Sequence, residues 1–399
     1  MKTTDVVVVG AGPAGIAAAI TLRRAGREVV VVDRAQFPRD KCCGDGLTAG
    51  ALRRYESLGL VPASVPSWQV VNDVMVRSPS GRTVDFPLPR DAGVYAAVAP
   101  RAELDAAFVA VARDAGVVVH EGCALVDAAV GEHWVSIDVD GVGTIAAHYA
   151  IGADGMWSPL RKAVGAEDED GYFGEWHAFR QYYSGVGAKA RDLWVWFEPD
   201  FLPGYAWSFP LPNGRANVGF GVRREPGEKV RWIDLQARPH IAQVLGAGAV
   251  AEGPAKAWPI PARVDRTTLT AAGGRVLFVG DAARATDPMT GEGIGQALDT
   301  GVLAAEAVVH AGHKAPSRAA RDYEHAVKRG LAVDNRLADL LTRALKHRKG
   351  ARTAVRVAGL TPWTRRNFAR WLFEDYPRAL LATPRRWHRH MLTGPGAYR

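Results

Sequence analysis

The fold follows from one stretch near the start of the chain, Val6-Val7-Val8-Val9-Gly10-Ala11-Gly12-Pro13-Ala14-Gly15. Residues 5–9, Asp5 followed by four valines, predict a short buried strand, and the glycines after them have the spacing G-x-G-x-x-G. Residues 13–25 are rich in alanine and predict a helix that stops at Gly26, and residues 28–32 predict a second strand that ends at Asp33. A strand, glycine turn, helix and strand of this size form one parallel unit that binds a dinucleotide.

Each glycine of this unit has a physical task. Gly10 permits the tight turn, Gly12 lets the backbone approach a pyrophosphate, and Gly15 lets the helix pack closely on the strand. The helix N-terminus supplies N–H donors and a positive dipole, and Asp33 is placed to accept the ribose hydroxyls. The predicted cofactor-binding residues here are Gly10, Gly12, Ala14, Gly15, Asp33 and Arg34. This motif alone fits either NAD or FAD.

The length and composition indicate a globular protein of more than one domain. A chain of 399 residues exceeds the usual size of a single core, and 48% of its residues are hydrophobic. Its first residues lack the pattern of a secretory signal, and charged residues interrupt every apolar run of membrane-spanning length. Three cysteines, Cys42, Cys43 and Cys123, are too few for a disulfide scaffold and indicate free thiols in a cytoplasmic protein.

The positive charge is concentrated at the C-terminal end. Residues 351–399 hold ten arginines against Glu374 and Asp375, which accounts for the whole formal charge of +8. Aromatic and apolar residues lie between these arginines, namely Trp363, Phe368, Trp371, Leu372, Trp387 and Leu392. This mixture suits peripheral contact with anionic lipid on the inner face of a membrane, although an ordinary solvated face gives the same pattern. No nucleic-acid-binding motif accompanies the charge, so we expect no nucleic acid partner. We also expect no metal.

The remaining pattern indicates a discontinuous nucleotide-binding domain with an inserted sheet. Residues 101–115 predict a helix, 117–120 a strand, and 134–138 with 144–151 a hairpin-like pair. Between residues 174 and 222 aromatic residues alternate with others, which predicts an antiparallel substrate-domain sheet. We predict a cofactor domain from residues 1–70, 96–165 and 265–312, a substrate domain from 71–95 and 166–264, and a basic helical subdomain from 313–399.

Two further segments resemble fingerprints of the flavin hydroxylase type of protein. Gly152-Ala153-Asp154-Gly155, followed by Ser158 and Arg161, is similar to the second fingerprint, and Gly280-Asp281-Ala282-Ala283 is similar to the third. The following segment 287–295 opens a helix whose N–H groups we expect to face the flavin N1 and O2 edge. The resemblance implies non-covalent FAD, bound additionally by Arg101, Asp154, Gly280, Asp281, Gly291, Gly293 and Ile294. A surface arginine is the alternative for Arg101.

Two motifs resemble the geranylgeranyl reductase family within the para-hydroxybenzoate hydroxylase-like superfamily. Lys41-Cys42-Cys43-Gly44-Asp45-Gly46-Leu47 is similar to its K-P-C-G-x-G-L element, with Cys42 in place of proline. Gly204-Tyr205-Ala206-Trp207-Ser208-Phe209-Pro210 is similar to its Y-x-W-x-F-P element. The resemblance implies an α/β fold with a Rossmann-like FAD-binding domain, an antiparallel substrate sheet and a C-terminal helical subdomain.

The resemblance also implies a reaction and its site. FAD reduced by NAD(P)H or a ferredoxin-like protein would saturate C=C bonds of a hydrophobic polyprenyl substrate, such as a geranylgeranyl lipid or a prenylquinone tail. Cys43 is the implied catalytic residue and, with Gly44, an implied cofactor contact, while Tyr205, Trp207 and Phe209 are implied substrate contacts. A buried structural thiol is the alternative for Cys43, and core packing is the alternative for the aromatic residues. Cys42 is expected to fill the place of the proline, the alternative being a strained disulfide with Cys43.

Two other functions fit the same scaffold. A flavin monooxygenase or halogenase shares the FAD fingerprints but uses oxygen, and halogenases resemble a W-x-W-x-I-P pattern from which residues 205–210 differ at the first and fifth positions. A carrier that binds FAD or prenyl lipid without turnover is the second alternative. The intact Gly12, Gly15, Asp281 and Gly293 argue for retained cofactor binding.

Overall fold

The N-terminal strand, turn, helix and strand are present in the computed structural model, which describes residues 2–167, 174–224, 230–373, 387 and 394–399. Strand β1 (Lys2–Val9) pairs in parallel with β2 (Val29–Asp33), and helix α1 (Pro13–Arg24) connects them. Gly10 has φ 106°, which favours glycine, and Pro13 opens the helix where no intrahelical donor is needed. The prediction for this unit is confirmed.

An eight-stranded sheet continues from this unit, in the order β17-β18-β11-β1-β2-β8 with β10 and β9 attached through β11. The added strands are β8 (Val118–Glu121), β9 (Leu125–Val130), β10 (Val135–Val139), β11 (Gly143–Gly152), β17 (Thr270–Ala271) and β18 (Val276–Phe278). β11 joins β1 in parallel, and β18 joins β11 in parallel from a segment far along the chain. The predicted hairpin-like pair is confirmed, because β10 and β11 are antiparallel partners.

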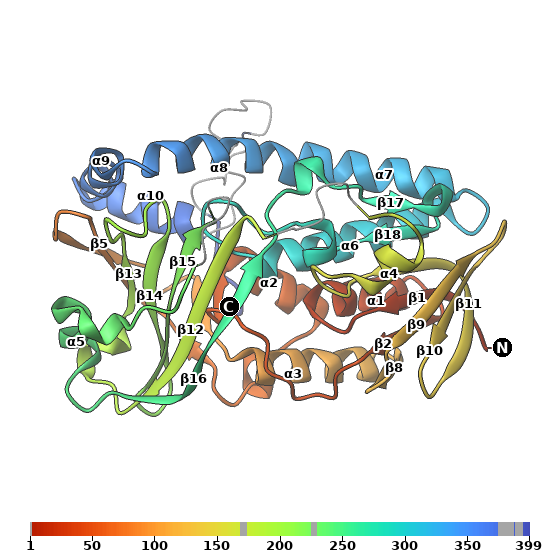
Figure 1. Cartoon of the computed structure of the whole chain (residues 1–399), viewed down its shortest axis with the longest axis horizontal. Helices are drawn as coiled ribbons and strands as arrows, with labels where there is room; N and C mark the ends of the chain where they lie inside the picture. The colour runs from red at the N-terminus through yellow and green to blue at the C-terminus, as the bar shows by residue number, and fades with distance from the viewer. Residues whose placement is uncertain (1, 168–173, 225–229, 374–386, 388–393) are drawn as a thin grey trace.

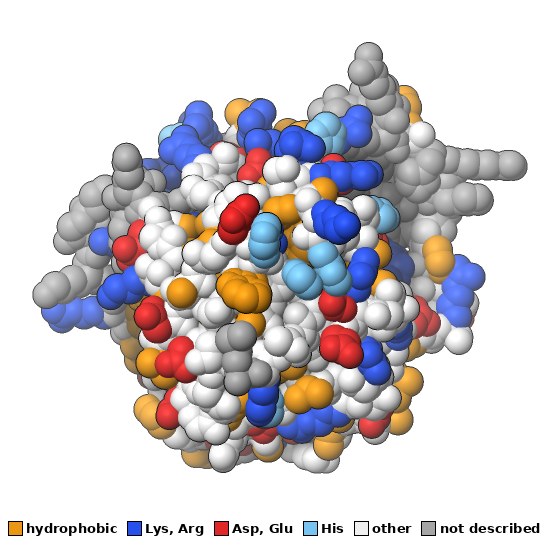
Figure 2. Space-filling view, turned by 90° about the vertical axis from the view of Figure 1, so that its right-hand side faces the viewer, with side chains coloured by type: hydrophobic (Ala, Val, Ile, Leu, Met, Phe, Trp, Pro, Cys, Tyr) orange, Lys and Arg blue, Asp and Glu red, His pale blue; other side chains and the backbone are white. Residues whose placement is uncertain are grey.

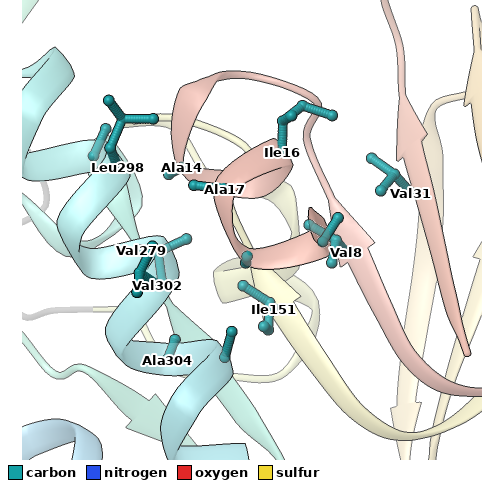
Figure 3. Packing of buried hydrophobic residues seen from close by; sticks show 14 of the residues in the cluster. Val8, Ala14, Ile16, Ala17, Val31, Ile151, Val279, Leu298, Val302 and Ala304 are labelled. Atoms are coloured by element: carbon teal, nitrogen blue, oxygen red, sulfur yellow. The ribbon is translucent and has the colours of Figure 1, made fainter. Parts of the chain in front are cut away.

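Helices α1 and α6 (Ile294–Ala311) pack against each other beside this sheet. A Cβ on Gly301 of α6 would lie 2.1 Å from the carbonyl oxygen of Ala14. Figure 3 shows Ala14 and Ala17 of α1 facing Leu298 and Val302 of α6. Helix α3 (Arg101–Asp114) also contacts α1. The small residues at this crossing allow an approach that any larger side chain would prevent.

A seven-stranded sheet forms the other half of the molecule (Figure 1). Its order is β16-β12-β15-β14-β13-β5-β6. These strands are β5 (Asp73–Arg77), β6 (Thr83–Pro87), β12 (Trp176–Ser184), β13 (Leu193–Trp196), β14 (Tyr205–Leu211), β15 (Arg215–Arg223) and β16 (Val250–Ile260). The sheet is antiparallel except that β13 and β5 run in parallel, because β5 arrives from an earlier part of the chain. The predicted domain limits stay a prediction, although both predicted substrate-domain segments contribute strands to this one sheet.

A three-stranded sheet and short helices connect the two halves. The sheet contains β3 (Gly46–Thr48), β4 (Gln69–Val70) and β7 (Ala96–Val98). Helix α2 (Ala49–Leu58) follows β3 and contacts α6. The remaining short helices are α4 (Pro159–Ala163) and α5 (Pro239–Leu245).

The C-terminal region is helical, as predicted. Helices α7 (Pro316–Arg329) and α8 (Leu331–Leu345) run along both halves, and α9 (Arg348–Ala358) and α10 (Pro362–Phe373) lie beside the seven-stranded sheet (Figure 1). The chain end is not helical: buried Ala397 forms a β-bridge with Val94. Of the predicted lipid-facing residues, Leu392 lies outside the described residues, and the structure describes only the backbone of Trp371 and Leu372. Phe368 instead packs on Phe86 with ring centroids 4.9 Å apart. Among the described helices, none is long and apolar enough to cross a membrane.

The face at the N-terminal end carries mixed charges and a group of histidines (Figure 2). The rings of His148 and His313 stack with centroids 4.0 Å apart, and His313 Nε2 lies 3.1 Å from Asp5 Oδ1. Arg27 Nη1 lies 3.4 Å from the same nitrogen. Asp5, His148 and His313 are near enough to one another to hold a metal ion, but the Arg27 guanidinium already supplies positive charge there.

Gly301→Val is expected to lower the free energy of unfolding by about 1–3 kcal/mol or more, because the new side chain would collide with the backbone of α1. Gly187→Ala is the matched control, since its Cβ would meet neighbours at an ordinary 3.6 Å. Urea unfolding followed by circular dichroism measures both variants. Equal stability of Gly301→Val and the control would contradict the close crossing.

Candidate active site

One cavity of about 1140 Å³ gathers the predicted site residues of both halves. Its walls come from the ends of β1 and β2, the loop before β3, the strands β13 and β14, and the segment before α6. Among the predicted cofactor and substrate residues, Gly15 alone does not line it. Those that do are Gly10, Gly12, Ala14, Asp33, Arg34, Cys43, Gly44, Arg101, Asp154, Tyr205, Trp207, Phe209, Gly280, Asp281, Gly291, Gly293 and Ile294.

The glycine turn has the shape that a pyrophosphate requires. A Cβ on Gly10 would lie 2.2 Å from the carbonyl oxygen of Ala153, and a Cβ on Gly15 would lie 1.9 Å from that of Gly10. Gly12 borders the cavity, and the nearest group to its Cβ position is an Arg39 nitrogen at 3.7 Å. Gly10 and Gly15 therefore serve packing, while Gly12 leaves the helix N-terminus open to an anion. The residues present fit a dinucleotide cofactor.

Asp33 is held rigidly at the end of β2. Its Oδ2 accepts a hydrogen bond from Ala11 N at 2.7 Å, and its Oδ1 accepts one from Ala35 N at 2.8 Å. The carboxylate thus closes the glycine turn and still borders the cavity. Exposed Arg34 follows it on the cavity rim. Contact of Asp33 with a ribose, and of Arg34 with the cofactor, stays a prediction.

The Asp154 carboxylate shapes the second fingerprint loop. It accepts hydrogen bonds from Ser158 Oγ at 2.6 Å and Leu160 N at 2.8 Å, which fixes the start of α4. Burial raises the pKa of Asp154 to about 6, although both hydrogen bonds oppose the rise. The loop lines the cavity, while these two oxygens are engaged in capping.

Arg161 joins the second and third fingerprints, a role that the sequence did not reveal. Its buried guanidinium donates to the carbonyl oxygens of Ala166, Thr268 and Ala282, each at 2.8 Å. It also lies over the ring of Phe278 in β18 at 3.9 Å. Long-range pairing of this kind has no signal in the local sequence.

The third fingerprint continues into a braced loop before α6. Asp287 Oδ1 accepts hydrogen bonds from Met289 N at 2.9 Å and Thr290 N at 2.7 Å. Glu292 Oε1 accepts from Gly295 N at 2.7 Å. The sequence predicts that segment 287–295 offers a run of free backbone N–H groups to the flavin. This prediction is wrong for most of the segment, because the N–H groups of Asp287, Met289, Thr290, Gly291, Glu292 and Gly295 donate to partners within the loop.

A basic rim lies over the third fingerprint. Lys41 Nζ lies 3.4 Å from Asp281 Oδ2 and 4.1 Å from the ring centroid of Trp258. Asp40 pairs with Arg180 and Lys256. Paired charges from the loop before β3 and from the seven-stranded sheet therefore border the cavity, which is lined by Asp40, Lys41, Lys256 and Asp281.

Arg101 is buried and fixed, which a surface arginine is not. Its guanidinium makes two hydrogen bonds to Asp105, at 2.8 and 2.7 Å, and Arg39 adds a contact to Asp105 at 3.2 Å. Arg101 lines the cavity beside Cys43. Its contact with the cofactor stays a prediction.

The loop of Cys43 meets the substrate strand. Cβ atoms on Gly44 and Gly46 would lie 3.2 and 2.9 Å from the ring of Phe209, so larger residues would push this ring away. Burial raises the pKa of the Cys43 thiol. Cys42 donates to the carbonyl oxygen of Lys256 at 3.5 Å, and burial raises the pKa of its thiol to about 12. All three cysteines are free, so Cys42 and Cys43 form no disulfide.

Three aromatic residues of β14 form one wall of the cavity. Ring centroids of Tyr205 and Trp207 lie 6.0 Å apart, and those of Trp207 and Phe209 lie 5.9 Å apart. Tyr205 Oη donates to the carbonyl oxygen of Thr290. The predicted substrate strand is thus tied directly to the loop before α6.

The C-terminal helices complete the apolar end of the cavity. Its lining there comes from Leu341, Ala344, Leu345, Ala351, Val355 and Phe368. Residues 341, 344 and 345 have the i, i+3, i+4 spacing of one helix face. The sequence therefore shows that these residues share a face, but not that this face lines the cavity.

Comparison with known proteins agrees with this geometry. The family model of the FAD binding domain matches residues 3–329. A menaquinone reductase of Mycolicibacterium smegmatis is 36% identical over 85% of this chain and 84% of its own. A digeranylgeranylglycerophospholipid reductase of Methanopyrus kandleri is 31% identical over 77% of each chain.

Solved structures share the fold. A geranylgeranyl bacteriochlorophyll reductase-like protein from Thermoplasma acidophilum has a TM-score of 0.76 at 20% identity, covering 97% of this chain and 100% of its own. A halogenase bound to FAD also shares the fold at 16% identity, so the fold alone does not separate reduction from oxygen chemistry. The fingerprints, the shared cavity and the similarity along most of the sequence agree: this chain is an FAD-dependent oxidoreductase and belongs to the geranylgeranyl reductase family.

Proposed function

We propose that this enzyme saturates C=C bonds in the polyprenyl chain of a prenylquinone or a geranylgeranyl-type lipid. The observation that carries the proposal is the single cavity in which the FAD fingerprints meet the aromatic strand β14 and the apolar helices α8 and α9. Relatives named as menaquinone and digeranylgeranylglycerophospholipid reductases support this class of substrate. Tyr and Trp side chains suit a long apolar chain whose polar head stays at a wet mouth.

The chain's residues supply position, dryness and a proton. Reduced FAD, when bound, supplies a hydride to one alkene carbon. The other carbon takes a proton, for which the Cys43 thiol is the proposed donor, so that two hydrogens add across the bond. Because burial raises the pKa of this thiol, it holds its proton at neutral pH. The aromatic wall excludes water and fixes the double bond near the thiol.

Product mass decides the proposal. The purified protein, reduced with dithionite under argon, is incubated with geranylgeranyl diphosphate or with menaquinone, and lipids are re-exposed to air before mass spectrometry. Air returns a quinol to the quinone, so a persistent gain of two hydrogens marks a saturated tail bond. An unchanged lipid under argon, with oxygen or halide incorporated after air is admitted, would assign the enzyme to the monooxygenase or halogenase class.

Cys43→Ser is expected to keep FAD and to lower kcat by about 10²-fold or more, because a hydroxyl is a far weaker acid than a thiol. Serine retains an acceptor for the neighbouring Asp45 N–H, so the loop should keep its shape. Anaerobic turnover and flavin content measure the two effects. Cys42→Ser is the comparison, and an equal loss in both variants would remove the specific role of Cys43.

We further propose peripheral membrane contact through the C-terminal helices. Leu360, Trp363 and Val357 are 61, 67 and 52% exposed, and the exposed Arg352 and Arg356 lie on the neighbouring helix α9. The same helix lines the apolar end of the cavity, which suits delivery of a lipid from a bilayer. We propose NAD(P)H or a ferredoxin-like protein as the immediate electron donor.

The variant Leu360→Ser/Trp363→Ser should bind vesicles of mixed phosphatidylglycerol and phosphatidylcholine about tenfold more weakly than the parent protein, because it loses apolar anchors. Arg352→Ala/Arg356→Ala should bind the anionic vesicles about thirtyfold more weakly, since each arginine contributes about 1 kcal/mol near anionic lipid, and this loss should disappear on neutral vesicles. Trp134→Ser serves as control, because Trp134 is 51% exposed and directly precedes β10, which lies at the end of the molecule away from α9 and α10 (Figure 1). Sedimentation with vesicles that is equal for all variants would sink the membrane proposal.

A further inference from the structure

Asp45 occupies a position that a carboxylate rarely holds. It is 0% exposed and has φ 64°, a left-handed conformation that residues other than glycine adopt infrequently, Asn and Asp more readily than most. Its carboxylate accepts hydrogen bonds from Tyr182 Oη at 2.6 Å, Asn217 Nδ2 at 2.8 Å and Arg101 N at 3.3 Å. All three groups act as donors, so the arrangement fits the ionised form of Asp45.

The same hydrogen bonds fix the Cys43 loop to the substrate sheet. Asp45 N donates to Cys43 Sγ at 3.3 Å, and Asn217 Nδ2 also donates to the carbonyl oxygen of Cys43 at 2.9 Å. Asn217 Oδ1 in turn accepts from Trp207 Nε1 at 3.1 Å. A continuous set of contacts therefore runs from a cavity-lining Trp through Asn217 to Asp45 and Cys43.

The charge of Asp45 also acts on the thiol. Burial is the main cause that raises the pKa of Cys43, while the neighbouring Arg101 lowers it and Asp45 raises it. Arg101 alone would favour a thiolate, which cannot donate a proton. The negative charge of Asp45, which lies in the same loop as the thiol, opposes this effect of Arg101 on the pKa of Cys43.

We infer that Asp45 is a positioning residue for the reduction: its buried carboxylate holds the Cys43 loop against Trp207 and places a negative charge beside the Cys43 thiol that offsets the charge of Arg101. The effect on turnover rests on the proposed function of Cys43. The effect of Asp45 on the Cys43 thiol itself does not rest on that proposed function and can be measured separately.

This role gives the enzyme an acid limit. Burial raises the pKa of Asp45 to about 6, opposed by Tyr182, Asn217 and the charge of Arg180. The other groups that face it are Arg101, paired with Asp105, and Cys43. Because the pKa of Asp45 in the folded protein lies above the ordinary 3.8, ionisation of Asp45 lowers the stability of the fold as pH rises from about 4 to 6. Below about pH 6 the carboxyl group is protonated, which places an additional hydrogen among the three groups that donate to it. Turnover should therefore fall as pH drops through about 6.

The first test measures the thiol directly. In the FAD-loaded protein carrying Cys42→Ser and Cys123→Ser, the rate of Cys43 alkylation by iodoacetamide is followed against pH. Asp45→Asn should lower the pKa of Cys43 and raise the alkylation rate near neutral pH by about tenfold, because Arg101 is no longer offset. Asp127→Asn, on an exposed part of β9, is the matched control. Identical alkylation in the two variants would overturn the inference.

The second test uses the pH profile of prenyl reduction. Asp45→Asn should lower kcat by about 10- to 100-fold and abolish the acid limb, since a misplaced donor costs rate rather than substrate affinity. Tyr182→Phe removes one donor to Asp45, so the acid limb should move to higher pH, a result that titration of Asp154 does not produce. If Asp45→Asn does not fold, Tyr182→Phe decides, and an unmoved limb overturns the inference. An absence of prenyl reduction in the parent protein, with the alkylation shift present, would reject the proposed function but not the role of Asp45.

Discussion

The structure depends on how closely backbone can approach backbone around the first glycine turn. Side chains at Gly10, Gly15 and Gly301 would meet carbonyl oxygens at 2.2, 1.9 and 2.1 Å. Absence of those side chains lets β1, α1 and α6 stack without a gap, and this stacking sets the loops of the second and third fingerprints beside the first. The opening at Gly12 and the long cavity beside it follow from that arrangement.

The cavity joins two sheets that differ in what they contribute. Parallel strands of the first sheet end in loops that suit a charged, extended cofactor, while β14 of the second sheet presents aromatic rings. The Cys43 loop lies between them, with Gly44 and Gly46 against Phe209. Hydrogen bonds of Asp45 and Asn217 fix the contact between the two halves, so the proposed proton donor Cys43 is placed by the same interactions that join the Cys43 loop to the substrate sheet.

Much of this arrangement was predictable where the signal was local. The parallel unit at residues 5–33, the paired strands β10 and β11, and the meeting of the three fingerprints in one place follow from periodicity, glycine spacing and family resemblance. Features that rest on distant partners were missed: the strand β16, the parallel pairing of β5 with β13, and the buried contacts of Arg161. The role of Asp45 could not be predicted from its place between two glycines, because the groups that donate to its carboxylate come from residues 101, 182 and 217. Glu292 and Phe368 show the same limit, because local sequence does not reveal which neighbour a side chain will meet.

The most direct measurement of the central claim is transfer of electrons from the reduced protein to an isolated double bond without oxygen. Dithionite-free, FAD-reduced protein is mixed under argon with geranylgeranyl diphosphate or with its fully saturated phytanyl counterpart, and the absorbance of oxidised flavin is followed. The account predicts that the unsaturated chain restores this absorbance, one flavin for each double bond saturated, whereas the saturated chain leaves it unchanged. Absorbance that returns only after air is admitted, whichever chain is present, would contradict direct reduction of the alkene in this cavity.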